Sequence, residues 1–174
     1  MKTKFHFFIL LLLVSCGAMA DNIKVPKGIL VLDSVLAKPF TLPDIDGEPH
    51  SFTTQSDKWR FVHFWASWCG PCRREMPLIQ SLANAMQDKP LEIILINTAE
   101  DEDTIFSFMG IVTPDMNSLM DRDGEITERW QPRGLPTTIL VDPQGRKRYM
   151  AIGGREWSTK PYLNFLQRLF DNKE

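Results

Sequence analysis

The sequence Trp-Cys-Gly-Pro-Cys at residues 68–72 constrains the fold of this 174-residue chain more than any other feature. It follows the compact apolar run Phe61–Trp65 and precedes residues 73–87, whose apolar side chains recur at helical spacing. The apolar run predicts a buried central strand, and the periodic segment predicts a helix. The two cysteines therefore lie where a buried strand passes into a helix.

This position gives the two thiols different chemistry. A cysteine at a helix start lies among backbone N–H groups that lack a partner within the helix, at the positive end of the helix dipole. These surroundings favour the thiolate, which is the form that attacks a disulfide. We therefore predict that Cys69 is the nucleophile. Cys72 lies one turn deeper, and we expect it to attack the resulting mixed disulfide and release the reduced substrate.

Three other uses of a closely spaced cysteine pair are open. A structural disulfide would stabilise the fold little here, because the loop that it closes is short. A zinc site would need two more ligands, and the only histidines are His6, His50 and His63. A copper carrier would suit two soft thiolates, although no pattern of Met or His accompanies them.

The N-terminal residues predict export from the cytoplasm. A basic start with Lys2 and Lys4 precedes the apolar run Phe7–Val14, which is too short to span a membrane. We therefore interpret residues 1–20 as a signal peptide.

Two processing sites compete within this signal. The small residues of Ala18-Met19-Ala20 suit an ordinary signal peptidase. Leu13-Val14-Ser15-Cys16 instead resembles the lipobox of bacterial lipoproteins, in which cleavage leaves the cysteine as an acylated N-terminus. Both processed forms are expected in the periplasm or cell envelope. If the chain is cleaved before Cys16, the lipid on Cys16 would anchor it to a membrane. In such an oxidising compartment a close cysteine pair has redox meaning.

Composition limits the class of protein further. With 43% hydrophobic residues and 20 Lys and Arg against 22 Asp and Glu, the chain is neither disordered nor a polytopic membrane protein. The lack of a basic excess argues against nucleic acid as a partner. Three cysteines are too few for a disulfide scaffold or a four-thiolate metal site. The length fits one domain, which we place at residues 38–174 after a lead-in at residues 21–37.

The remaining segments predict an α/β sandwich. Asp46-Gly47 is a hairpin turn signal between two short apolar segments of Phe40–Phe52. Strands and helices then alternate, which implies a central mixed sheet flanked by helices and ending in an antiparallel hairpin. The further strands expected are Leu91–Ile96, Thr137–Val141 and Lys147–Ile152, and the helices are 101–109, Glu125–Trp130 and Ser158–Phe170, with Ser158 as N-cap of the last.

Residues 64–72, Phe-Trp-Ala-Ser-Trp-Cys-Gly-Pro-Cys, resemble the thioredoxin superfamily. Arg73–Pro77 and Arg133–Thr138 resemble the exported TlpA/ResA-like thiol-disulfide oxidoreductases, and the likeness extends over roughly residues 38–170. The resemblance implies a thioredoxin-like fold that needs no cofactor. It also implies an enzyme that reduces protein disulfides through the dithiol–disulfide couple of this cysteine pair.

The resemblance assigns roles around the cysteine pair. It implies that Pro136 is a cis-proline facing the pair and that Leu135 presents its backbone to a substrate strand. Glu75, three residues after Cys72 on the same helical face, is expected to assist proton transfer, unless it is a surface acid of the first helical turns. Trp68, beside the nucleophile, is expected to supply an apolar docking face.

Some positions extend or depart from the family pattern. His63 stands where thioredoxins carry a buried acid, so it either accepts the proton of Cys72 or is a packed polar residue without a role. Asp101–Met120 matches the helix and strand that exported relatives insert, and we expect this insert to govern partner choice. Thr137 follows the cis-proline where the cytochrome c maturation branch places Glu, which argues against that branch.

The residues between the cysteines indicate the direction of electron flow. Gly-Pro is the dipeptide of thioredoxin, whose potential of about −270 mV lies at the reducing end of the scale. By this resemblance we expect a monomeric reductant of disulfide-containing exported proteins, recycled by a membrane thiol reductant. The alternative from another class is a non-catalytic binding module or copper metallochaperone with the same fold.

Overall fold

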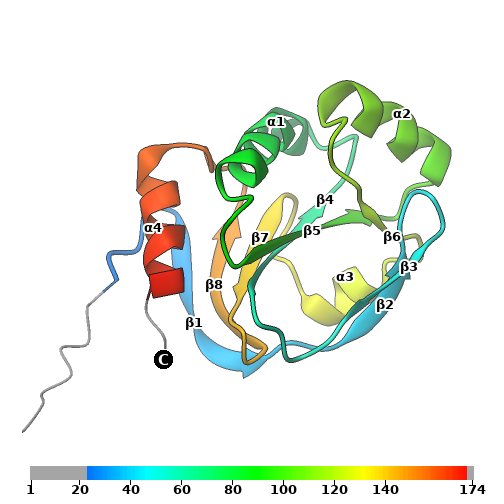
Figure 1. The fold of residues 1–174 in the computed structure, drawn as a ribbon. Coiled ribbons are helices and arrows are strands. Elements are labelled where there is room, and N and C mark those ends of the chain that lie inside the picture. The colour runs from blue at the N-terminus through cyan, green and yellow to red at the C-terminus, as the bar shows by residue number, and fades with distance from the viewer. Residues whose placement is uncertain (1–22, 172–174) are drawn as a thin grey trace, which may run out of the picture.

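The computed structural model describes residues 23–171, so the predicted signal peptide and Cys16 lie outside the described residues. The described chain forms a six-stranded sheet in the order β1-β8-β7-β4-β5-β6 and a separate hairpin, β2–β3 (Figure 1). The strands are β1 (Ile29–Leu36), β2 (Phe40–Pro43), β3 (Pro49–Phe52), β4 (Trp59–Trp65), β5 (Leu91–Thr98), β6 (Leu119–Asp121), β7 (Thr137–Val141) and β8 (Arg146–Ile152), and the helices are α1 (Gly70–Ala85), α2 (Glu102–Val112), α3 (Glu125–Trp130) and α4 (Lys160–Asp171).

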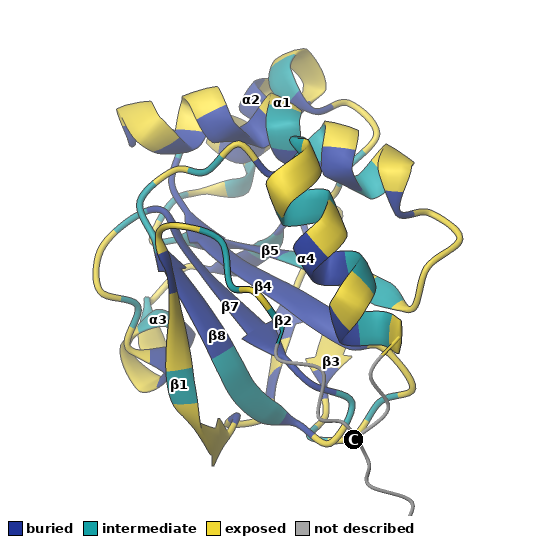
Figure 2. Cartoon of the chain, turned by 90° about the vertical axis from the view of Figure 1, so that its left-hand side faces the viewer, coloured by how far each residue is buried: buried dark blue, intermediate teal, exposed yellow. Residues whose placement is uncertain are grey.

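Strand β4 lies inside the sheet, parallel to β5 and antiparallel to β7. Every residue of β4 is buried, as expected of a strand that is covered on both faces. Its side chains alternate between two apolar clusters: Phe61 and Trp65 face the cluster of α1, α2 and α4, whereas Val62 and Phe64 face that of α3 and the hairpin. Figure 2 shows the contrast between the dark blue central strands and the largely exposed edge strand β1.

The fold class predicted from the sequence is confirmed, and each expected strand and helix is present with small shifts at its ends. The prediction that Ser158 caps the last helix is wrong. That helix, α4, begins at Lys160, and the carbonyl of Thr159 accepts its first backbone hydrogen bonds. The cap position falls later because the turn after the buried Trp157 includes Ser158. Residues 29–36, in the expected lead-in, form β1 and extend the sheet by pairing with β8.

The segment Asp101–Met120 contains the added helix and strand that the resemblance implied. Asp101 caps α2, because its carboxylate accepts the backbone N–H and the hydroxyl of Thr104. Phe108 of α2 packs against Trp65, with ring centroids 5.2 Å apart. β6 extends the sheet parallel to β5. The insert therefore contacts the end of the strand that leads to the cysteine pair.

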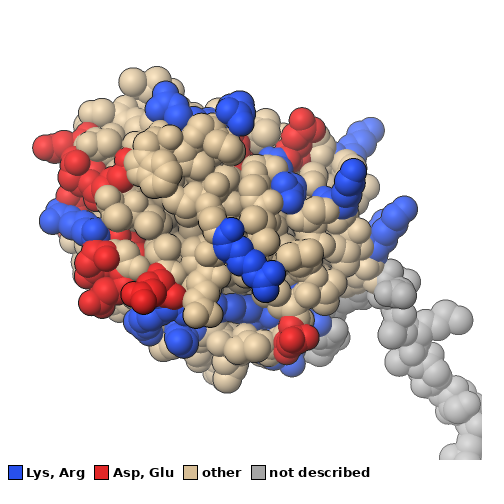
Figure 3. All heavy atoms as spheres, turned by 180° about the vertical axis from the view of Figure 1, so that it is seen from behind, with Lys and Arg blue, Asp and Glu red and all other residues tan. Residues whose placement is uncertain are grey.

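The charged side chains do not form a continuous basic surface on the face that Figure 3 shows. Basic residues are scattered over this face, and acidic residues gather toward one side of it. Within residues 23–171, no helix is long and apolar enough to cross a membrane.

Asp121 at the end of β6 is buried, and its carboxylate accepts the N–H groups of Ile126 and Thr127 and the hydroxyl of Thr127. Asp121→Ala leaves these donors without an acceptor, so we expect the free energy of unfolding to fall by about 3 kcal/mol. Denaturant unfolding measures this loss. In the control Asp123→Ala, an exposed carboxylate that accepts the N–H of Glu125 is removed, and about 1 kcal/mol or less should be lost. Equal losses would contradict the structural role of Asp121.

Candidate active site

The two cysteines are joined by a disulfide at the start of α1, with Cα atoms 5.2 Å apart. Cys69 is the N-cap of the helix, and its sulfur accepts the backbone N–H of Cys72 at 3.2 Å. Cys69 is 6% exposed and Cys72 is fully buried, which confirms the expected difference in access. The same N–H would stabilise a Cys69 thiolate in the reduced protein, because a helix start favours negative charge.

The cis peptide bond expected before Pro136 is present between Leu135 and Pro136. Pro136 directly precedes β7, whose Thr137 pairs with Phe64 of β4. It therefore lies at the end of β4 from which the chain continues to Cys69. Leu135 is half-buried and packs against the cluster that contains both cysteines.

Two tryptophans flank the loop before the cysteine pair in different ways. Trp65 is buried and donates its indole N–H to the hydroxyl of Ser118 at 3.1 Å. Trp68 is 70% exposed and immediately precedes Cys69. A large apolar ring is thus held at the surface immediately before Cys69.

Glu75 is buried rather than a surface acid, so that alternative is wrong. Its Oε1 accepts the backbone N–H of Arg155 at 2.9 Å and the indole N–H of Trp157 at 2.6 Å. Burial raises the pKa of Glu75 to about 7, although these two hydrogen bonds and the charge of Arg155 oppose the rise. A carboxyl group in these surroundings can gain or lose a proton near neutral pH.

His63 lies on β4 and is fully buried. Its Nδ1 is 2.9 Å from the hydroxyl of Thr138, and its Nε2 is 3.9 Å from Oε2 of Glu75. Burial lowers the pKa of His63 to about 3, so the imidazole is neutral at physiological pH. The structure therefore places His63 beside Glu75 on the α1 side of the sheet.

Glu100 holds the loop before Cys69, and the sequence analysis did not identify it. Its carboxylate accepts the backbone N–H of Ser67 at 2.7 Å, the hydroxyl of Ser67, and the amide of Asn97 at 2.7 Å. The register of the sheet contains a signal for this contact. Since β4 and β5 are parallel and Trp65 pairs with Asn97, the residues that follow the two strands meet at one edge.

A pocket of about 320 Å³ opens along the first turns of α1. It includes Pro71 from between the cysteines and Glu75 from the next turn of α1. The other residues that line it are Arg74, Leu78, Gly154, Arg155 and Glu156.

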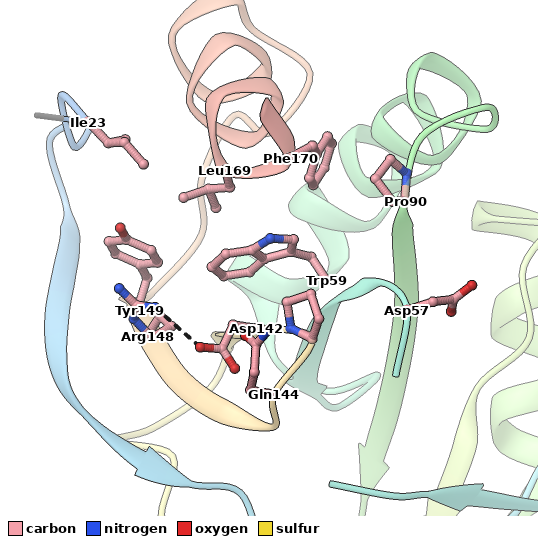
Figure 4. Close-up of a pocket in the computed structure, with 11 residues that line it drawn as sticks. Ile23, Asp57, Trp59, Pro90, Asp142, Gln144, Arg148, Tyr149, Leu169 and Phe170 are labelled. Atoms are coloured by element: carbon pink, nitrogen blue, oxygen red, sulfur yellow. Dashed lines mark hydrogen bonds and ion pairs between the residues drawn. The ribbon is translucent and has the colours of Figure 1, made fainter. Parts of the chain in front are cut away.

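A larger pocket of about 400 Å³ lies at the other end of the sheet (Figure 4). Its aromatic lining includes Trp59, Tyr149 and Phe170. Trp59 begins β4, whereas Cys69 follows the end of that strand, so this pocket is separate from the redox site. Among residues 23–171, no group of three or more His, Cys, Asp or Glu side chains could hold a metal ion.

A dithiol at a helix start, next to a cis-proline at the end of a buried strand, defines a thiol-disulfide oxidoreductase of thioredoxin-like fold, and this protein works through the Cys69–Cys72 couple. The model of the AhpC/TSA family matches residues 35–150, and the chain belongs to this family. Thiol-disulfide oxidoreductase ResA of Geobacillus thermodenitrificans is 31% identical over 149 residues, which cover 83% of each chain. ResA of Bacillus subtilis is 26% identical over 132 residues, covering 75% of this chain and 74% of that protein.

Solved structures show the same fold. A putative thiol:disulfide interchange protein DsbE from Chlorobium tepidum has a TM-score of 0.72 at 21% identity, covering 81% of this chain and 99% of that chain. StoA from Bacillus subtilis has a TM-score of 0.63 at 23% identity, covering 75% of this chain and 98% of that chain. The six-stranded sheet with helices on both faces is therefore the thioredoxin-like arrangement.

The raised pKa of Glu75 makes a prediction about stability. An acid whose pKa is about 7 in the fold and 4.5 as its ordinary value favours folding in its protonated form. Its contribution is complete below pH 4.5 and is lost as the pH rises to 7. Glu75→Gln can keep both hydrogen bonds to Oε1 without ionising, so its stability relative to wild type should rise by about 3 kcal/mol over that interval.

Denaturant unfolding of the oxidised proteins at several pH values measures this difference, because the bonded cysteines do not titrate. Glu156→Gln, which removes an exposed carboxyl from the same pocket, controls for the loss of one charge. If the difference between Glu75→Gln and wild type did not vary with pH, Glu75 would ionise in the fold as it does in the unfolded chain.

Proposed function

We propose that this protein is a reductant of disulfide bonds in exported proteins. The observation that carries the proposal is the unequal burial of the two cysteines at the start of α1: Cys69 keeps an exposed fraction of 6%, and Cys72 keeps none. A substrate can therefore reach only one of the two sulfurs directly. The second sulfur reacts with the first, which is the order that a two-step reduction needs.

The reaction transfers two electrons to the substrate. The Cys69 thiolate attacks one sulfur of the substrate disulfide, so that a Cys69–substrate bond forms while the substrate S–S bond breaks. The first substrate sulfur leaves as a thiolate and takes a proton from water. Cys72 then loses its proton and attacks the sulfur of Cys69, and the second substrate sulfur leaves as a thiolate that takes up a proton in turn. The substrate ends as two thiols, and the protein ends with the Cys69–Cys72 disulfide.

Glu75 is the proposed acceptor for the proton of Cys72. Both residues are buried, and they lie three residues apart on one face of α1. An acid with a pKa of about 7 is suited to this task, since general acid–base catalysis is most effective when the pKa of the group is near the working pH. Bulk water has no comparable access to the enclosed thiol.

Trp68 and Leu135 are the proposed docking residues for the substrate chain. Trp68 offers an exposed ring beside Cys69, and Leu135 offers backbone groups just before the start of β7. Pro136 has no N–H of its own and ends the run of possible backbone donors there. An extended segment on either side of the substrate disulfide could pair with Leu135 and pack on Trp68.

The direction of electron flow rests on the Gly-Pro dipeptide between the cysteines. Thioredoxin, with the same dipeptide, is a reductant at about −270 mV. An oxidising compartment would exhaust such a dithiol, so we assign it a membrane thiol reductant as electron donor and a monomeric state in which Cys69 stays accessible. The relatives named ResA are thiol-disulfide oxidoreductases, which supports the reaction class.

We place the protein in the periplasm or cell envelope. Residues 1–20 serve as the signal peptide, and cleavage before Cys16 would leave a lipidated N-terminus. The folded domain would then be tethered by the few residues between Cys16 and Ile23, where the described chain begins.

Reduction of insulin disulfides by the purified protein tests the activity. Wild type should precipitate insulin in the presence of a thiol donor, and Cys69→Ser should abolish this activity because the attacking thiolate is lost. Cys72→Ser should instead accumulate mixed disulfides on Cys69, and mass spectrometry of trapped adducts from cell extracts would identify the substrates. A wild type that leaves insulin intact and binds one copper ion per chain would support the metallochaperone alternative.

Membrane fractionation tests the anchor. Wild type should sediment with the membrane fraction, and Cys16→Ser should move to the soluble fraction because no acyl chain can be attached. Cys72→Ser serves as the control, since it changes the number of cysteines without changing Cys16. If wild type and Cys16→Ser were equally soluble, cleavage after Ala20 would be the correct processing.

A further inference from the structure

Two buried polar atoms, one from β4 and one from α1, face each other without a hydrogen bond. Nε2 of His63 and Oε2 of Glu75 lie 3.9 Å apart, and neither has a partner within the described residues. His63 is 0% exposed and Glu75 is 2% exposed. Polar atoms left unpaired in an apolar interior cost free energy. Their facing arrangement therefore indicates a contact that forms in another state of the protein.

The other polar atom of each side chain, Oε1 of Glu75 and Nδ1 of His63, already has a hydrogen-bond partner. Oε1 of Glu75 accepts the backbone N–H of Arg155 and the indole N–H of Trp157. Nδ1 of His63 is 2.9 Å from the hydroxyl of Thr138, its neighbour across the β4–β7 pair. These contacts orient the imidazole and the carboxyl. Nε2 of His63 and Oε2 of Glu75 take no part in these contacts and can therefore form a hydrogen bond with each other.

The hydroxyl of Thr138 allows His63 to be neutral in either of two tautomers, because a hydroxyl can both donate and accept a hydrogen bond. With the proton on Nδ1, His63 donates to Thr138 and its Nε2 can accept from a protonated Glu75. With the proton on Nε2, His63 donates to a Glu75 carboxylate, and the hydroxyl of Thr138 donates to Nδ1.

We propose that His63 is the positioning residue for Glu75: in the reduced protein its Nε2–H donates to Oε2 of the Glu75 carboxylate and holds that oxygen in place as Glu75 takes up the proton of Cys72. The inference rests on the proposed role of Glu75 as that acceptor. In the step itself, the S–H of Cys72 becomes a thiolate and the carboxylate of Glu75 becomes a carboxylic acid. His63 carries one proton before and after the step.

Among the groups around Glu75, His63 is the one that can either donate a hydrogen bond to Oε2 or accept one from it. The groups that contact the Glu75 carboxyl are His63 from β4 and Arg155 and Trp157 from the segment before α4, and Cys72 lies three residues before Glu75 on α1. Both N–H donors from that segment go to Oε1 and cannot accept a hydrogen bond. Arg74 and Glu156 line the neighbouring pocket. Burial, which lowers the pKa of His63, keeps the ring neutral throughout.

Reaction of the reduced protein with the aromatic disulfide dithiobis(nitrobenzoate) tests the proposal in one trace. The first equivalent of coloured thiol reports attack by Cys69, and the second reports attack by Cys72 on the mixed disulfide. Each phase is followed by stopped flow from pH 5 to about pH 9, which covers the titration expected of Glu75. Two variants are compared with wild type. The Asn side chain of His63→Asn can form a hydrogen bond with Thr138 but is too short to reach Glu75. The longer side chain of His63→Gln can place its amide nitrogen near the position of Nε2 and donate to Glu75.

In His63→Asn we expect the second phase to slow about tenfold and its midpoint to move to higher pH, because the Glu75 carboxylate loses its donor. The first phase should not change, and this also shows that the variant is folded. His63→Gln should recover most of the second phase. If His63→Asn had the wild-type rate and midpoint in the second phase, the proposal would be overturned.

The same trace separates this proposal from the reductase function on which it rests. Loss of both phases in wild type would overturn the reductase function itself. The ring nitrogen chemical shifts of His63 provide a readout that a purely structural role would not move. They should report a neutral ring with its proton on Nε2 where Glu75 is ionised, and a proton on Nδ1 there or an imidazolium at neutral pH would contradict the proposal.

Discussion

Strand β4 is covered on both faces, and its neighbours in the sheet bring the parts of the redox site to its end. The parallel partner β5 ends at the same edge and leads to Glu100, which binds the loop before Cys69. The antiparallel partner β7 begins there and is preceded by Pro136. The position of Cys69 thus depends on the packing of a buried strand between two apolar clusters. A change in the core of β4 would move the nucleophile, its loop and the cis-proline together.

A second set of contacts links the N-terminal edge of the sheet to the buried acid. The backbone N–H of Arg155 binds Glu75, while its guanidinium donates to the carbonyls of Gly28, Ile152 and Gly154. Gly28 has a φ of +85°, and a Cβ there would lie 2.6 Å from Nε of Arg155. Only glycine allows this approach without strain. The chain before β1 therefore braces the segment that orients the carboxyl group of Glu75.

The sequence was informative where chemistry is local and uninformative where it depends on distant segments. The dithiol and its helix start could be predicted, because they lie within a short motif whose residue types have few other uses, and the cis-proline could be predicted from the resemblance of Arg133–Thr138 to exported oxidoreductases. The partners of these residues could not be predicted. Glu100 binds Ser67 across 33 residues, and Arg155 binds Glu75 across 80 residues. His63 was noticed as a departure, but its contact with Glu75 required the relative placement of β4 and α1.

The buried acid and the buried imidazole act in opposite directions on the pH dependence of folding. Glu75 has a pKa of about 7 against an ordinary 4.5, so its contribution to stability is lost as the pH rises across that interval. His63 has a pKa of about 3 against an ordinary 6.5, so its contribution is complete above pH 6.5 and is lost as the pH falls toward 3. Between pH 4.5 and 6.5 the two slopes oppose each other. The site thus keeps an ionisable carboxyl group. Because the neutral histidine lies beside it, the free energy of unfolding varies less with pH in this interval than it would with either residue alone.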